Sequence, residues 1–187
     1  EFMTMSLTEL LQNRHATRSI SPEPLDEHQV SELIEAARLT PSCFNNQPWR
    51  FLFLEGEDAR KKGAEILKEG NRKWASRAPL LVVAYSRRED DCILPDGRAY
   101  HQFDLGMAVM NLMLAATQHG LVARPMAGFE PEKAKLLFGL AEGEDPLVML
   151  AIGHPSPDTD HLPDYAKELD KKPRERKSAS IIVKRLT

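Results

Sequence analysis

The sequence between residues 98 and 120 carries a long apolar helical pattern, and this pattern limits the folds that the chain can adopt. Leucine, alanine, valine and methionine recur at helical spacing, which gives the helix a wide apolar face, and Gly120 ends it. A helix with so wide an apolar face cannot lie mainly in water. We therefore expect it in the middle of the protein.

Four short apolar runs have the length and composition of strands. Their residues are rich in valine, leucine, isoleucine and phenylalanine, and the expected strands cover residues 50–55, 79–86, 121–126 and 147–153. The second is the most continuously apolar and is typical of a buried strand.

Helical patterns lie before and between these strands. Ser6 with Glu9, and Asp26 with Gln29, have capping-box spacing and predict helices that end near Arg14 and before Pro41. Further helices are expected over residues 58–70 and 131–138. Strands and helices therefore interleave along the chain.

Length and charge narrow the class of protein. A chain of 187 residues can bury a core as a single domain, which we assign to residues 1–187. No apolar stretch approaches the ~20 residues that cross a bilayer, so we expect a protein that stays in solution. A net charge of −3 gives no general attraction for nucleic acid or an anionic membrane, and we expect neither as a partner.

The ends of the chain have a different composition. Glu1 and Phe2 precede Met3, and we expect residues 1–5 to be disordered or left over from expression. Residues 154–187 are rich in proline, aspartate, lysine and arginine, with "SIIV" at 180–183 as their last apolar run. We expect this part to be an extended tail that wraps a partner surface.

Cysteine and histidine spacing predicts no metal site. Two cysteines, Cys43 and Cys92, are too few for a disulfide framework and lack zinc-ligand spacing, which favours a cytoplasmic location. We interpret Cys43 as a small residue of a close-packed loop, because no histidine partner for a nucleophile is visible.

Two basic segments lie far apart in the sequence. "RHATR" at 14–18 has two guanidinium groups that can grip a phosphate, and "KKPRERK" at 171–177 could converge on the same anion. The alternatives are a solvated basic turn and a solvated charged face.

Carboxamides and a glycine mark three other segments. In "PSCFNNQPWRF" at 41–51, Asn45 and Gln47 can read the edge of a heteroaromatic ring, or the loop can simply satisfy its own backbone. Asn71 in "GNRKW" is another carboxamide, or part of a helix C-terminus. Gly128 in "PMAGFE" permits another group to approach the backbone closely, or it simply forms a turn at the end of a strand.

These five segments, in this order, resemble the nitroreductase family of FMN-dependent oxidoreductases from about Leu7 to Val183. The resemblance also covers "DLGMAVMNLMLAATQHGL" in the long helix. It departs at Ala16, where a serine is common, at Ala127, where some members have an acidic residue, and in the absence of long inserted helices over the substrate channel.

The resemblance implies an FMN site with no obligatory catalytic side chain and no metal. The segment 14–18 corresponds to the phosphate and ring-edge segment, and the tail arginines complete the phosphate grip. The loop at 41–45 reaches the flavin of the other subunit. Asn71 faces the pyrimidine edge, and the pair 127–128 supplies backbone N–H groups near flavin N5. The implied cofactor-binding residues are Arg14, His15, Ala16, Thr17, Arg18, Pro41, Ser42, Cys43, Asn45, Asn71, Ala127, Gly128, Arg174 and Arg176.

The implied fold is α+β, with a mostly antiparallel sheet flanked by helices, in an intertwined homodimer whose C-terminal strand is exchanged. The implied activity transfers a hydride from NADH or NADPH through flavin N5 to a small electron-poor acceptor, such as a nitroaromatic or a quinone, by a ping-pong route. Alternatives are reductive dehalogenation or flavin breakdown on the same fold, and a flavin-binding protein without turnover.

Overall fold

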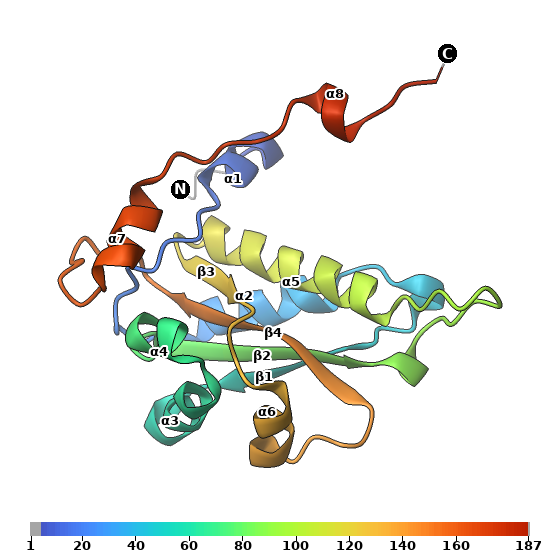
Figure 1. Ribbon diagram of the computed structural model, residues 1–187, viewed down its shortest axis with the longest axis horizontal. Helices are drawn as coiled ribbons and strands as arrows, with labels where there is room; N and C mark the ends of the chain where they lie inside the picture. The colour runs from blue at the N-terminus through green and yellow to red at the C-terminus, as the bar shows by residue number, and fades with distance from the viewer. Residues whose placement is uncertain (1–4, 187) are drawn as a thin grey trace.

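An antiparallel sheet of four strands forms the centre of the computed structural model, which describes residues 5–186 (Figure 1). The strands are β1 (Trp49–Leu54), β2 (Leu80–Arg87), β3 (Val122–Met126) and β4 (Glu144–Gly153), in the order β1-β2-β4-β3. The α+β class and all four expected strands are confirmed. The expectation for residues 1–4 falls outside the described part of the chain.

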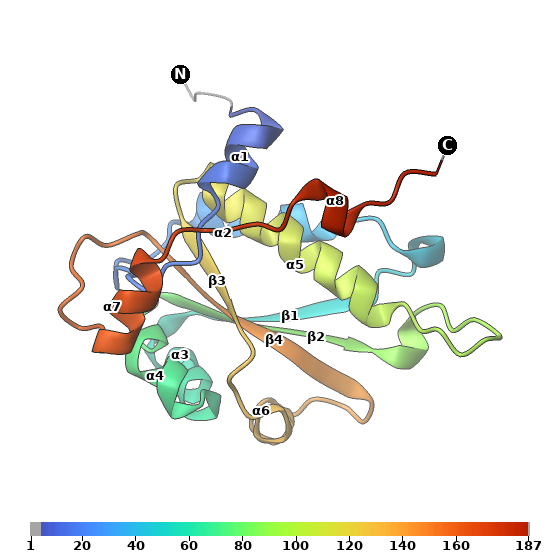
Figure 2. The ribbon, with the colours of Figure 1, turned by 45° about the horizontal axis from the view of Figure 1, so that its top comes forward.

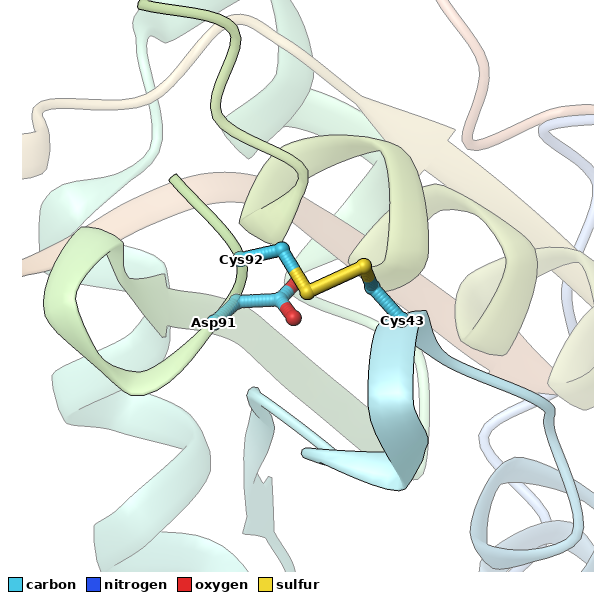
Figure 3. A group of neighbouring side chains, drawn as sticks. All are labelled: Cys43, Asp91 and Cys92. Atoms are coloured by element: carbon cyan, nitrogen blue, oxygen red, sulfur yellow. A yellow bond between two sulfur atoms is a disulfide. The ribbon is translucent and has the colours of Figure 1, made fainter. Parts of the chain in front are cut away.

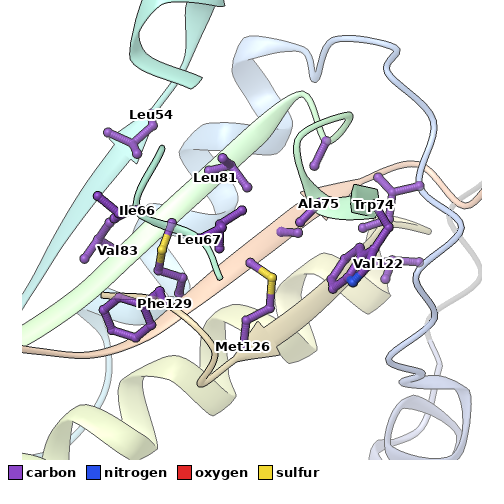
Figure 4. Packing of buried hydrophobic residues seen from close by; sticks show 14 of the residues in the cluster. Leu54, Ile66, Leu67, Trp74, Ala75, Leu81, Val83, Val122, Met126 and Phe129 are labelled. Carbon is purple, nitrogen blue, oxygen red and sulfur yellow. The ribbon is translucent and has the colours of Figure 1, made fainter. Parts of the chain in front are cut away.

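Both faces of the sheet are buried because alternate residues of the central strands enter two different cores. Leu81 and Val83 of β2 pack into one cluster, with Trp74 and Met126 (Figure 4). Leu80, Val82 and Ala84 pack into the other. This explains why β2 is continuously apolar: its first seven residues are all buried.

Helices cover the two faces. On one face lie α2 (Glu27–Arg38) and α5 (His101–Gln118), whose buried side chains join the second cluster. On the other lie α3 (Gly56–Ile66), α4 (Glu69–Ala75) and α6 (Pro131–Phe138). Figure 1 shows the long helix α5 along the sheet, as its apolar pattern predicted.

Two capping boxes are present where the spacing predicted them. Ser6 and Glu9 cap α1 (Leu7–Asn13), and Asp26 and Gln29 cap α2, each with both reciprocal hydrogen bonds. These signals depend only on residues within one helical turn, which is why the sequence reveals them.

The helix expected over residues 58–70 is two helices, so that prediction was wrong. Leu67 is extended and forms an isolated bridge with Phe129, and the Lys68 N–H donates to the Gly128 carbonyl oxygen at 3.0 Å. The chain therefore leaves α3 to pair with a distant segment and begins α4 at Glu69. Asn71 lies in the first turn of α4, and the alternative of a helix C-terminus at this residue is excluded.

The tail is only partly extended. Residues 164–171 form α7 (Asp164–Lys171), and Leu162 and Ala166 join the first core cluster. Beyond α7 the chain passes α1 and reaches a short helix, α8 (Ala179–Ile182), which stands away from the body in Figure 1. In the view of Figure 2 the tail crosses in front of α5. Within one chain, "SIIV" is therefore helical for most of its length and is not a strand.

None of the helices in residues 5–186 combines the length and the apolar character that crossing a membrane requires.

Candidate functional site

A pocket of about 370 Å³ lies where α1, β3, α7 and the tail meet. It brings together seven of the fourteen cofactor-binding residues expected from the sequence, from both ends of the chain. The lining residues are Arg14, His15, Ala16, Thr17, Arg18, Arg124, Leu169, Asp170, Lys172, Arg174 and Arg176.

The pocket is strongly cationic. Six of its lining side chains are arginine or lysine, and Asp170 is its one carboxylate. Burial lowers the pKa of Arg14, and the nearby charges of Arg174 and Arg176 lower it further. Burial also lowers the pKa of Arg124, together with the charge of Arg18. Both shifts indicate that the cations repel one another and are incompletely solvated, so the pocket favours an anion.

Asp170 organises one wall of this pocket. Its carboxylate accepts hydrogen bonds from the Thr17 hydroxyl at 2.9 Å and the Arg18 backbone N–H at 2.6 Å, and it pairs with the Arg18 guanidinium. The Arg18 and Asp170 side chains are only 12% and 15% exposed. One side chain of α7 therefore fixes the segment 14–18, and Arg18 is engaged within the protein.

Arg174 also lines the pocket and binds the end of α1. Its guanidinium donates to the carbonyl oxygens of Leu11, Gln12 and Arg14 at 3.3, 2.8 and 2.7 Å. The last carbonyls of a helix have no partner within the helix and attract a cation. Among residues 5–186, no carboxylate pairs with the Arg14 guanidinium, which leaves its donors for a ligand.

Two lining residues that matter, Arg124 and Asp170, were missed by the sequence reasoning. Arg124 donates to the Ala16 carbonyl oxygen, and its guanidinium lies 5.4 Å from the centre of the Trp74 ring. A signal existed for Arg124, since it occupies the same face of β3 as the buried Val122 and Met126. Asp170 lies in a polar tail, where nothing distinguishes it from other acidic residues.

Asn71, Ala127 and Gly128 lie together but outside that pocket. The Asn71 side-chain amide donates to the Gly128 carbonyl oxygen at 3.0 Å, and a Cβ added at Gly128 would lie only 2.6 Å from that nitrogen. The contact therefore requires glycine at 128. Gly128 follows Arg124 by four residues, about 13 Å of extended chain. An elongated ligand with an anion at one end and a polar ring at the other fits this spacing.

The loop at 41–47 lies elsewhere, beside the start of α5. Phe44, Asn45 and Gln47 all have positive φ angles, 48°, 59° and 53°, which side chains with a Cβ rarely adopt. The Gln47 side-chain amide donates to the Asn45 carbonyl oxygen at 2.9 Å, and the Gln47 N–H donates to the Ser42 hydroxyl at 2.9 Å. Phe44 is 89% exposed. Within one chain, the loop residues Pro41, Ser42, Cys43 and Asn45 do not meet the cationic pocket.

Cys43 and Cys92 form a disulfide, so the interpretation of Cys43 as merely a small packing residue was wrong (Figure 3). Their Cα atoms lie 6.1 Å apart, within the range for a disulfide, although 49 residues separate them in sequence. Spacing alone could not reveal the pair, because the fold brings the loop at 41–47 against the segment after β2.

Comparison with known proteins gives a consistent result. The sequence model of the nitroreductase family matches residues 11–73 and 64–154. A Streptomyces coelicolor protein provisionally named an NADH dehydrogenase/NAD(P)H nitroreductase is 26% identical over 169 residues, covering 80% of this chain and 85% of that protein.

Two solved structures are also similar. An oxidoreductase containing FMN has a TM-score of 0.84 at 27% identity, covering 99% of this chain and 95% of that one. A nitroreductase family protein of Clostridium difficile 630 has a TM-score of 0.81 at 22% identity, covering 98% and 99%, and supports the fold.

Replacing Asp170 by asparagine should weaken the wall of the cationic pocket. We expect Asp170→Asn to lower the free energy of unfolding by about 1 to 3 kcal/mol. The part-buried side chain that accepts three hydrogen bonds would lose its negative charge, which weakens these bonds. Urea denaturation measures the change. Glu168→Gln is the matched control on α7, where a 70%-exposed carboxylate pairs with Lys171, and should cost less than about 1 kcal/mol. Equal losses in the two variants would contradict this role of Asp170.

Proposed function

This chain belongs to the nitroreductase family, and on that premise we propose that it is an oxidoreductase that binds FMN and takes electrons from NADH or NADPH. The cationic pocket carries the proposal, because it gathers residues from both ends of the chain around a space suited to an anion. The similar structure described as an oxidoreductase containing FMN supports the choice of cofactor.

The pocket fits the phosphate end of FMN by charge and by geometry of its donors. A phosphate monoester carries up to two negative charges near neutral pH and accepts hydrogen bonds from several donors at once. Arg14 has donors that no residue in the described part of the chain engages, while Arg18, Arg124 and Arg174 contribute charge from fixed positions. Ala16 offers no hydroxyl, so the segment 14–18 binds with one side-chain donor fewer than a serine would give.

The contact between Asn71 and Gly128 suits the ring end. The Asn71 amide nitrogen is engaged by Gly128, which leaves its carbonyl oxygen as an acceptor for a ring N–H. The Gly128 N–H donates to no acceptor among residues 5–186 and is available to a ring nitrogen. When bound, FMN supplies the redox chemistry by accepting a hydride at N5 and passing electrons to a second substrate. The protein's part is binding, orientation and one backbone donor.

The acceptor in this proposal is a small electron-poor molecule, such as a nitroaromatic or a quinone, which reacts after the oxidised nicotinamide has left. A flat electron-poor ring suits a site that lacks long covering helices. The cytoplasmic location expected from the sequence stays a prediction.

A second copy of the chain completes the proposed site. The outer face of α5 carries Phe103, Met107, Met110 and Leu114 at helical spacing, and Phe103 is 62% exposed. In the tail, Ile181, Ile182 and Val183 are 57% to 69% exposed. Monomers rarely leave two such apolar surfaces in water. In a homodimer these surfaces are covered, and the loop at 41–45 of one chain reaches the cofactor held by the other.

Reduction of the flavin by nicotinamide tests the proposed activity. We expect anaerobic stopped-flow mixing of the FMN-loaded protein with NADH or NADPH to bleach the flavin absorbance near 450 nm, and subsequent addition of a quinone to restore it. A flavin that stays oxidised with both nucleotides would contradict the proposed reductase activity and would favour a flavin-binding protein without turnover.

Removing the free guanidinium should weaken cofactor binding without unfolding the protein. We expect Arg14→Ala to reduce the FMN binding free energy by about 1.5 to 3 kcal/mol, the range for a hydrogen bond to a charged group. Fluorescence titration of the apoprotein measures it. Arg87→Ala is the control, because Arg87 is exposed at the end of β2 and, among residues 5–186, forms an ion pair with Glu89 alone. An Arg14→Ala titration that matches the wild type would refute this assignment.

Shortening the tail should separate dimer formation from phosphate binding. Deleting residues 178–187 keeps Arg174 and Arg176 but removes Ile181, Ile182 and Val183, so we expect the dimer mass to be lost in light scattering. Deleting only 184–187 should preserve the dimer. A dimer that survives the longer deletion would show that the tail does not hold the subunits together.

A further inference from the structure

We propose that His28, Glu32 and His119 form a binding site for a divalent transition-metal ion of the zinc class. The site joins the start of α2 to the end of α5. It lies apart from the cationic pocket and uses none of the residues assigned to FMN, so it does not depend on the proposed function. Spacing along the chain does not reveal it, because His119 reaches the two residues of α2 only through the packing of the helices.

Helix α2 supplies two of the ligands from one side. His28 and Glu32 are four residues apart in the helix, so their side chains lie one above the other, and both are exposed. The nearby carboxylate of Glu35 is already engaged, since its two oxygens accept from the Arg38 guanidinium at 2.6 and 2.7 Å. In the described part of the chain, the one basic side chain within ion-pair distance of Glu32 is that of His119. Glu32 is therefore the carboxylate available to an ion.

His119 supplies the third ligand from a fixed position. It ends α5, where its backbone N–H donates to the carbonyl oxygens of Ala115 and Ala116 at 3.1 Å each. Its side chain is only 17% exposed, and its Nε2 lies 3.9 Å from the Glu32 carboxylate oxygen. The centre of its ring lies 5.6 Å from that of His28, with the two rings nearly perpendicular. Both helices therefore direct metal-binding groups to one place.

The distances are close to those that one ion requires. Two ligand atoms about 2.1 Å from a tetrahedral ion lie about 3.4 Å apart, and two imidazole rings bound to it have centres about 5 to 6 Å apart. The ring separation already falls in that range. A small rotation of the half-exposed Glu32 side chain shortens the 3.9 Å separation, and the exposed ring of His28 can turn a nitrogen toward the ion. Side-chain rotation alone completes the site.

The donor atoms determine which ions fit. Imidazole nitrogen with one carboxylate oxygen suits zinc and the other late first-row ions, whereas magnesium and calcium prefer oxygen ligands throughout. Among the described residues, the one hydrogen bond of a histidine ring joins His101 to Ser86, so no such bond occupies the rings of His28 and His119. Three protein ligands leave one position of a tetrahedral ion for water.

The proposed homodimer leaves this site open. The apolar outer face of α5, which the dimer covers, points away from His119 by about 150° around the helix axis. Since α2 rises about 1.5 Å per residue, His28 lies about 15 Å from Arg38, at the opposite end of the helix from the loop at 41–45. Metal binding and the proposed dimer therefore use different surfaces.

Titration with zinc tests the site in the full-length protein, prepared without a purification tag and treated with a chelator. Calorimetry should show one zinc ion bound per chain, and zinc should raise the melting temperature, because an ion that binds only the folded chain stabilises it. Magnesium at the same concentration should do neither. Absence of zinc binding, or an equal response to magnesium, would overturn the proposal.

Substitution of each ligand shows where the ion is held. His28→Ala, His119→Ala and Glu32→Gln should each weaken zinc binding by at least about tenfold, because each removes one of three ligands. Glu27→Gln is the matched control, since Glu27 is exposed in the first turn of the same helix and should change the affinity less than about twofold. An unchanged zinc affinity in any of the three ligand variants would contradict the site.

The zinc response and the flavin separate a lost ligand from a damaged fold. The melting temperature of each variant is compared with and without zinc, so a change in basal stability does not enter the result. We expect the ligand variants to lose the zinc-induced rise and to keep the FMN absorbance of the wild type, because none of these residues lines the cationic pocket. Loss of zinc and FMN together would contradict the separation of the two sites.

Discussion

The positive charges gathered in one pocket repel one another, and many contacts of this structure offset that repulsion. Six basic side chains and one carboxylate share the space at the meeting point of α1, β3, α7 and the tail. Each fixed cation has a specific partner: Arg18 has Asp170, Arg174 has the carbonyl end of α1, and Arg124 has the Ala16 carbonyl and the Trp74 ring. These contacts position both ends of the chain and leave Arg14 facing the pocket. A dianionic ligand is the simplest way to relieve the remaining repulsion.

The sequence revealed what depends on local patterns. Four strands, the capping boxes at Ser6 and Asp26 and the long central helix follow from spacing within a few residues. The break between α3 and α4 could not be predicted, because it depends on the Gly128 carbonyl some sixty residues away. Within the tail, α7 was hidden by its polar composition, although Leu162 and Ala166 reach the core.

The candidate site was predictable in part for the same reason. Two basic segments could be recognised, and the family resemblance indicated that they converge. The residues that hold these two segments together could not be recognised. Asp170 and Arg124 act through tertiary contacts, which the sequence does not show. The Cys43–Cys92 disulfide is the clearest case: the two residues are unremarkable in sequence, and only the fold brings them together.

The most direct test of the account compares FMN with riboflavin, which has the same ring but no phosphate. If the cationic pocket binds the phosphate, isothermal titration of the apoprotein should show FMN binding at least about a hundredfold more tightly, since two hydrogen bonds to a charged group contribute about 3 to 6 kcal/mol. The preference should shrink as salt rises. Equal affinity for the two flavins would contradict the claim that this pocket holds the phosphate of the cofactor.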